Sequence, residues 1–338
     1  MRNETRILYS RMLSNMARAY GVNTVTQSFA VSIPMETKIN DKIRESLAFL
    51  QAITMSAVTD SKGQALELGV SGLLAKRTNT ANNDRTPTTL GGPDGTAWEV
   101  ALTEFDVAIG YQLLDQWARY PDFYQRYMNA VFHKIALDRL TIGWYGESVA
   151  AETAPATYPL GQDVNIGWLK LLADNNSGNF MTEGATAGSI IIGSAAGADY
   201  KNVDALAFDL YAGIPVEHRT GKEVVLVGSS LIADDQNKVA TQNAHTPTEK
   251  KQGLATLANS YGGLPALTPP KFPDTGMMIT DPANLHLYYQ EGKTRRNTEE
   301  ESKRNRVVDY ISSNDAYAIG NLKGVVAIEA ANVVINNG

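Results

Sequence analysis

The N-terminal segment has the apolar spacing of an amphipathic helix. Leu8, Met12, Met16 and Tyr20 recur every four residues and therefore lie on one helical face. Gly21 follows as a suitable C-terminal stop. The pattern predicts a helix over residues 3–20. Residues 22–34 then become β-branched and polar, which favours an extended arm with little core of its own, and a second helix is expected over 38–53.

The next segment alternates in the way strands do. Residues 58–74 and 98–109 alternate like strands, with Leu66, Leu68 and Val70 set against Glu67, Gly69 and Ser71, whereas 75–97 between them is almost purely polar. A connection of about 20 residues without its own core is uncommon inside a compact domain and usually indicates a function, disorder or a partner that orders it. The pattern predicts a protruding β-arm.

The longest predicted helix covers residues 121–147. Pro121 suits the first helical position, Asp122 is favourable near the helix N-terminus, and apolar residues step by four from Phe123. At about 1.5 Å per residue the helix would be roughly 39 Å long. Such a rod could span a whole domain.

The second half mixes helices with strands, and a charged segment interrupts its last part. Helices are predicted over 166–173, 203–212 and 230–240, and strands over 223–228, 277–280, 285–290, 307–312, 316–320 and 325–329. Residues 291–306 form a charge run. Two interpretations of this run stay open, namely a solvated hairpin and a network of ion pairs between subunits.

Composition narrows the possible functions. The 338-residue chain has no cysteine, which excludes disulfides, thiolate zinc sites and cysteine nucleophiles and is compatible with a reducing cytoplasm. A net charge of −6 gives no global attraction to polyanions or membranes. No apolar run is long enough to span a bilayer, and the N-terminus lacks the apolar core of a secretory signal.

A search for chemistry finds no catalytic or metal-binding pattern. Gly292-Lys293-Thr294 resembles the end of a phosphate-binding loop, but the earlier glycine is replaced by Leu287. A nucleophile elbow at Gly69 fails because Leu73 stands where its closing glycine belongs. The four histidines lack metal-ligand spacing. We expect no cofactor, no metal and no enzyme activity.

The N-terminal 45 residues are locally basic, with seven basic against four acidic residues. One interpretation is an ordinary amphipathic helix packed on a neighbour. The other is an inward-facing segment that contacts a scaffold or packaged DNA through backbone charge, using Arg2, Arg6, Arg11 and Arg18.

Segments along most of the chain resemble one protein family. Residues 114–123 (LDQWARYPDF) are similar to the segment leading into the long spine helix of major capsid proteins of peduoviruses, which are temperate, contractile-tailed bacteriophages. Further collinear similarities are MRNETR at 1–6, IGWL at 166–169, VLVG at 225–228, LIAD at 231–234, GLPA at 263–266, FP at 272–273, MIT at 278–280, NL at 284–285, YY at 288–289, RR at 295–296 and NDAY at 314–317.

The resemblance implies an α+β fold of the Hong Kong 97 type. Its parts would be an N-arm (1–34), the first part of a peripheral domain (35–56), an extended E-loop (57–103), the peripheral domain with the spine helix (104–150), an axial domain (151–269) and returning peripheral strands (270–338). The implied function is a virion protein that self-assembles into hexamers and pentamers of an icosahedral head enclosing double-stranded DNA. The alternatives are an encapsulin-like compartment of the same fold and an α+β enzyme with an unrecognised site.

The resemblance also implies partners and surfaces. The partners are other copies of the chain, a scaffolding protein or protease, a portal at one vertex, packaged DNA bound without sequence specificity and a possible decoration protein, with assembly in the bacterial cytoplasm and no membrane. The expected assembly residues are Leu8, Met12, Met16, Lys76, Arg77, Trp98, Arg295, Arg296, Glu299 and Arg304.

Two family features concern maturation. Related capsid proteins lose an N-terminal piece to a protease, whereas the present sequence starts at Met1, and we expect an uncleaved chain. Some capsids of this fold cross-link lysine to asparagine. Lys76 and Asn79 lie in the polar tip, but nothing in the sequence supplies a partner or a catalytic carboxylate, and we expect no cross-link.

Overall fold

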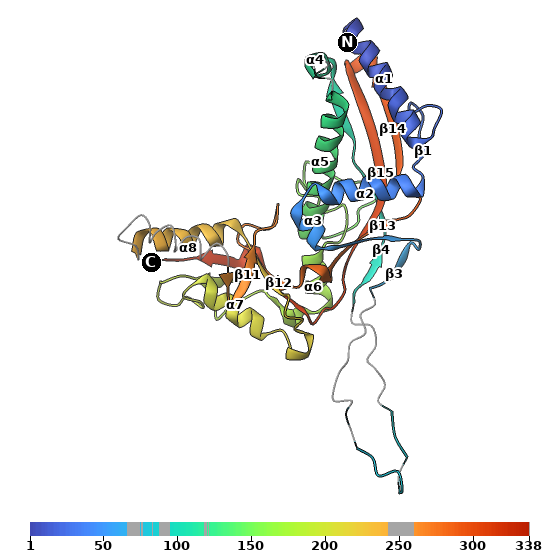
Figure 1. Ribbon diagram of the computed structural model, residues 1–338. Helices are drawn as coiled ribbons and strands as arrows, with labels where there is room; N and C mark the ends of the chain where they lie inside the picture. The colour runs from blue at the N-terminus through green and yellow to red at the C-terminus, as the bar shows by residue number, and fades with distance from the viewer. Residues whose placement is uncertain are drawn as a thin grey trace. The chain divides into compact units, whose positions relative to one another are not determined.

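The computed structural model describes residues 1–338 except 66–74, 76, 83, 88–94, 118–119, 121, 243–259 and 338. The chain divides into two compact units, shown with their elements in Figure 1. Unit 1 comprises Met1–Lys62, Glu99–Gly167 and His286–Tyr317. Unit 2 comprises Gly63–Trp98, Trp168–Leu285 and Ala318–Gly338. Each unit therefore uses segments that are far apart in the sequence.

The helices of unit 1 largely follow the predicted periodicity. They are α1 (Asn3–Tyr20), α2 (Ile33–Glu45), α3 (Ala48–Ala52), α4 (Tyr111–Trp117) and α5 (Phe123–Tyr145). The helix expected over 38–53 is two helices, and the first starts earlier because Pro34 fits an initial helical turn. Ser46 ends α2, where its hydroxyl donates to the Ile43 carbonyl at 2.7 Å.

The first sheet has β15 (Arg306–Ile319) at its centre. Its strand order is β1 (Phe29–Ala30), β14 (Arg295–Glu301), β15, β13 (Leu285–Gln290) and β2 (Thr54–Val58). β5 (Ala101–Glu104) and β6 (Val107–Gly110) also pair with β15. Two strands were predicted where β15 runs unbroken, because the polar residues Ser313 and Asp315 are buried and hydrogen-bonded.

The N-terminal connection between α1 and α2 lies along β14. The Thr298 N–H donates to the Val25 carbonyl at 2.8 Å and the Val31 N–H to the Thr294 carbonyl at 2.9 Å. Val25 and Val31 are only 1% and 3% exposed. Two β-branched side chains of the arm therefore pack within unit 1, whereas most of its other residues are exposed, so the arm contributes little core of its own.

Unit 2 is a second α/β core. Its sheet has the order β10 (Ser260–Tyr261), β11 (Leu264–Leu267), β9 (Val224–Val227), β12 (Met277–Thr280), β16 (Val325–Ile328) and β7 (Phe180–Met181). The helices are α6 (Trp168–Asn175), α7 (Val203–Ala212) and α8 (Ser229–Gln242), and β8 (Ile190–Ile192) pairs with β17 (Val333–Ile335). Leu206, Leu210 and Val225 belong to its fully covered apolar core.

Short 3₁₀ turns connect several of these elements. They are Ser177–Asn179, Val216–His218, Pro282–Asn284, Ser302–Arg304 and Ala330–Asn332.

The predicted β-arm has a firmly bonded base. β3 (Lys62–Gln64) pairs with β4 (Ala97–Glu99), and the Thr96 N–H donates to the Ile319 carbonyl at 2.9 Å while Ile319 N–H donates to the Thr96 hydroxyl at 2.8 Å. A Cβ on Gly95 would lie 2.1 Å from the Ala65 carbonyl oxygen, so only glycine fits there. The strand predicted over 98–109 is divided among β4, β5 and β6, whereas residues 66–74 of the other predicted strand and part of the polar tip lie outside the described residues.

Candidate functional site

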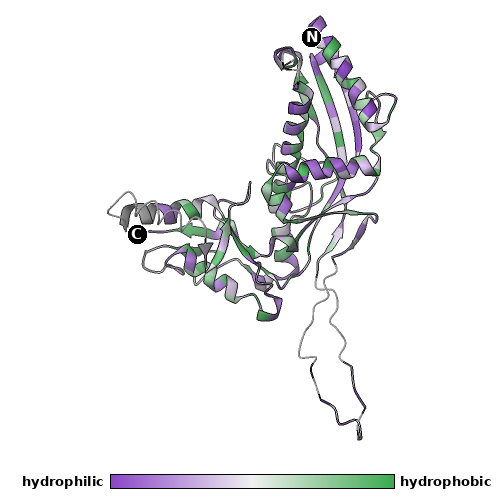
Figure 2. Cartoon of the chain, in the orientation of Figure 1, coloured by the Kyte–Doolittle hydropathy of each residue, from purple (hydrophilic) through white to green (hydrophobic). Residues whose placement is uncertain are grey.

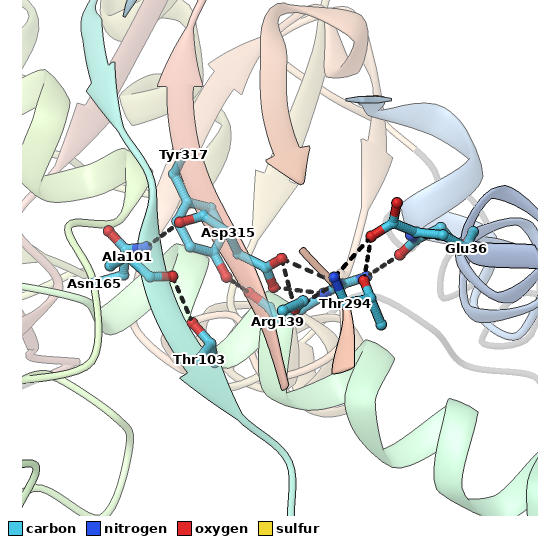
Figure 3. A network of polar contacts seen from close by, with 10 residues as sticks. Glu36, Ala101, Thr103, Arg139, Asn165, Thr294, Asp315 and Tyr317 are labelled. Carbon is cyan, nitrogen blue, oxygen red and sulfur yellow. Dashed lines mark hydrogen bonds and ion pairs between the residues drawn. The ribbon is translucent and has the colours of Figure 1, made fainter. Parts of the chain in front are cut away.

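A buried ion pair fastens the long helix α5 to β15 in unit 1. Arg139 and Asp315 are 2% and 1% exposed, and two N–H···O bonds of 2.9 and 3.1 Å join the guanidinium to the carboxylate. Figure 3 shows the two side chains facing each other across the interior. The same guanidinium donates to the Asn40 Oδ1 of α2 at 2.8 Å. One arginine thus connects two helices with the sheet.

The network continues in both directions along unit 1 (Figure 3). The Asn165 amide donates to the Asp315 carbonyl at 2.8 Å, and the Tyr317 hydroxyl donates to the Arg139 carbonyl at 2.8 Å. Beyond Asn40, the buried Glu36 carboxylate accepts the Thr294 N–H at 3.1 Å and also the Thr294 hydroxyl. Every carboxylate in this network has donors, which is the condition for burying charge without a large penalty.

A second buried ion pair joins β14 to β15. Arg296 and Asp309 are both 2% exposed, and Arg296 Nε donates to Asp309 Oδ1 at 3.0 Å. The Arg296 guanidinium also donates to the hydroxyl of Tyr20 at the end of α1. Burial opposes the charge on Arg296, but attraction to the Asp309 carboxylate outweighs it, and the pKa of Arg296 is raised. Arg296 therefore stays charged while it holds α1.

The first turns of α1 are attached by polar contacts at the exposed margin of unit 1. Arg6 forms a bidentate ion pair with Glu300, whose Oε1 also accepts the Tyr111 hydroxyl at 2.6 Å. The Arg2 backbone N–H donates to Asp115 Oδ1 in α4 at 3.0 Å. These hydrogen bonds lower the pKa of Glu300, chiefly through Arg6, and that of Asp115 through Thr5 and Arg2.

The residues predicted on α1 occupy two different surroundings. Met12 and Met16 are 7% and 1% exposed, so in a single chain they pack inside unit 1 and offer no surface to a neighbour. Leu8 is 38% exposed and remains a predicted assembly residue. Arg2, Arg11 and Arg18 are exposed, whereas Arg6 is already paired with Glu300. Hydrophilic and hydrophobic residues both occur along the length of α1 (Figure 2).

The predicted assembly residues near the polar tip are only partly described. Arg77 is exposed, Trp98 is half-buried over Gly63, and Lys76 lies outside the described residues. Their role in assembly stays a prediction.

The charge run is a hairpin, but its inner face is not solvated. Arg295, Glu299 and Arg304 are exposed, whereas Arg296 is buried, because alternate residues of β14 face the interior of unit 1. Arg306 pairs with Glu301. The description of the whole run as solvated is therefore wrong for Arg296, whose partner is within the chain.

The part of the chain that the structure describes offers no obvious chemistry. None of its histidines and carboxylates gather into a group of three that could hold a metal ion. Among the described helices, none has the length and hydropathy needed to cross a bilayer.

The helix start predicted at Pro121 and Asp122 is only partly described, and Asp122 makes a 2.7 Å ion pair with Arg126 without capping α5.

Comparison with known proteins gives matches along nearly the whole chain. The family model for the phage major capsid protein of the P2 family matches residues 8–331. The capsid proteins of Escherichia phage P2 are 31% identical over 330 residues, which cover 94% of this chain and 92% of that sequence. The major capsid protein of Serratia phage KSP20 is 30% identical over 340 residues, covering 97% of each.

Solved structures give the same result for the fold. A chain of the satellite phage P4 procapsid, which includes the size determination (Sid) protein, is similar with a TM-score of 0.80 and 29% identity, covering 100% of this chain and 99% of that one. A capsid chain of the native GTA particle has a TM-score of 0.51 at 15% identity over 84% and 89% of the two chains, which shows the fold alone. The predicted α+β fold of the Hong Kong 97 type is confirmed. With a family match from residue 8 to 331 and relatives at 30% identity or more, the chain belongs to the P2 family of phage major capsid proteins.

Proposed function

We propose that this protein assembles as hexamers and pentamers into the icosahedral head of a tailed phage and encloses double-stranded DNA. The family match carries the proposal. The two buried Arg–Asp pairs support it, because they stiffen unit 1 without forming a reactive site. A shell subunit needs a rigid frame that presents the same surfaces in every copy.

The subdivision inferred from the resemblance is part of this proposal. Residues 1–34 serve as the N-arm, 57–103 as the E-loop, and 151–269 as the axial domain, while 35–56, 104–150 and 270–338 form the peripheral domain. The bonded base of the E-loop at Thr96 and Ile319 supports its role, because a loop that grips a neighbour must be anchored in its own subunit.

The exposed arginines of α1 contact the packaged genome. Arg2, Arg11 and Arg18 have no acidic partner among the ion pairs of the described residues, and lysine or arginine side chains bind phosphates without reading sequence. The remaining partners, namely a scaffolding protein or protease, a portal and a decoration protein, follow from the family alone, as does assembly in the host cytoplasm.

Electron microscopy of the purified protein tests the function. Closed icosahedral particles are expected, alone or with the scaffolding protein co-expressed, and particles from infected cells should contain nuclease-protected DNA. Compact oligomers without shells would contradict the proposal. Shells that enclose a protein and no DNA would instead indicate a compartment.

Removal of the polar tip tests the E-loop. A chain in which a short Gly/Ser linker replaces residues 75–94 should stay folded and soluble but fail to form shells, because Thr96 and its hydrogen bonds to Ile319 remain at the base. Circular dichroism checks the fold, and sedimentation with electron microscopy counts the particles. The full-length chain prepared in parallel is the control, and normal shells from the shortened chain would contradict the assigned role.

A further inference from the structure

We propose that the loop of residues 148–160, which follows the C-terminal end of α5, is a contact surface for a second copy of this chain. The inference rests on the proposed function, because it assigns one particular surface to contacts between shell subunits. The observations concern the exposure, the internal order and the charge of this loop, all within unit 1.

The loop exposes two large apolar side chains, Val149 and Tyr158, to solvent. Each residue from 148 to 159 is exposed. Val149 and Tyr158 are 54% and 42% exposed, and Ile166 at the base of the loop is 36% exposed. Exposed apolar side chains mark an interaction site where they join into one patch, and Val149, Tyr158 and Ile166 are the residues from which we infer such a patch.

The loop is nevertheless tightly ordered by its own hydrogen bonds. The carboxylate of Asp163, which is 4% exposed, accepts the Ala154 N–H at 2.6 Å, and the Ala154 carbonyl accepts the N–H groups of Thr157 and Tyr158 at 2.9 Å. The Ala150 N–H donates to the Asp163 carbonyl at 2.9 Å. A surface that is ordered before binding loses less conformational entropy when a partner arrives.

A turn fixes the end of the loop against α5. The Gly161 N–H donates to the Tyr158 carbonyl at 3.0 Å, and Gly161 has a φ of +70°. A Cβ at this glycine would lie 3.1 Å from a side-chain carbon of Ile142 in α5, so the loop rests directly on the helix. The position of Tyr158 is thereby set by the longest helix of unit 1.

The composition of the loop selects the kind of partner. Glu152 is the only charged residue between 148 and 160, and no lysine or arginine is present. The loop therefore has nothing with which to bind phosphates. Interface centres are depleted in charge and enriched in tyrosine, which Tyr158 and the near absence of charge in the loop match. In a shell of one protein, each subunit is surrounded by copies of itself, which makes a second copy the occupant.

The absence of cysteine permits a direct test of contact. In a Val149→Cys chain, the single thiol should react with a maleimide rapidly in dissociated subunits and about tenfold or more slowly in assembled shells, because interface centres exclude solvent. Labelling in denaturant defines complete reaction. Equal labelling rates in subunits and shells would overturn the proposal while leaving shell formation itself intact.

A charged variant tests whether the contact is needed. Val149→Asp with Tyr158→Asp should leave the subunit folded by circular dichroism, since both side chains are exposed, but should reduce the yield of shells at least about tenfold through desolvation of the two charges. Val149→Thr with Tyr158→Phe is the matched control and should assemble normally. Normal shells from the charged variant would also overturn the proposal, whereas failure of the unaltered chain to form shells would count against the proposed function.

Discussion

At the residue scale, Arg139 and Asp315 show how a buried charge can be structurally necessary. Arg139→Ala would leave the Asp315 carboxylate buried without its cation, and removal of one partner of a buried pair typically costs about 3–5 kcal/mol. Denaturant unfolding of the isolated subunit followed by circular dichroism measures this decrease in stability.

Two further variants test whether the loss of stability in Arg139→Ala comes from the unpaired buried charge. Lys134→Met on the same helix breaks an exposed ion pair, in which the side chains of Lys134 and Asp138 are 66% and 36% exposed. This substitution should change the free energy of unfolding by less than about 1 kcal/mol. Arg139→Met combined with Asp315→Leu should recover part of the stability, because no unpaired charge remains. Equal changes in the free energy of unfolding for the Arg139 and Lys134 substitutions would show that the buried ion pair contributes no more stability than an exposed one.

At the element scale, α1 is attached through carboxylates and should respond to acid. The folded-state pKa values of Glu300 and Asp115 lie below their ordinary values of 4.5 and 3.8. Their contribution to holding α1 is therefore complete above those ordinary values and disappears as the pH falls through the lowered ones. A spin label on Asn15→Cys should stay immobile from neutral pH to about pH 5 and become mobile in more acidic solution.

The variant Glu300→Gln separates this attachment from general acid unfolding. It removes the ion pair with Arg6, so the label on α1 should already be more mobile at neutral pH, while circular dichroism remains that of a folded chain. Superimposable pH curves for the two chains would mean that Glu300 does not hold the helix.

Several elements could be predicted from the sequence because their periodicity is undisturbed. α1, α7, β12 and β13 have the predicted bounds, and α5 nearly so. α4 was missed because its residues follow directly on a strand-like alternation. Such failures occur where tertiary contacts override the local pattern.

The polar network was missed for a different reason. Arg139 continues the four-residue steps of Phe123, Tyr127, Val131 and Ile135. A charged residue on this apolar stripe could have indicated a buried ion pair from the sequence. Its partner Asp315 is 176 positions away, and no local pattern identifies a partner at that distance. Arg296 lies in a charge run in which strand alternation turns its side chain inward, and composition alone suggests solvent.

At the scale of the whole molecule, the genome contact predicts a salt dependence. Replacing Arg2, Arg11 and Arg18 by glutamine should weaken non-specific DNA binding and reduce the slope of log affinity against log salt by about 0.9 for each phosphate that is no longer neutralised. Filter binding across a salt series measures the slope. Replacing Lys134 by glutamine together with Asp138 by asparagine on α5 is the control, because it removes one charge of each sign away from α1, and an equal weakening in both variants would contradict the assignment.

The division of the chain has a consequence for its synthesis. Unit 1 needs His286–Tyr317, and unit 2 needs Ala318–Gly338. A ribosome that has not yet passed residue 286 has therefore completed neither core, and the central strand β15 emerges after the α-helices of both units. Folding that depends on such distant pairings is slow and exposes unpaired strand edges. A nascent chain consequently presents no finished subunit surface until both late segments have emerged, and chaperones are needed most before that point.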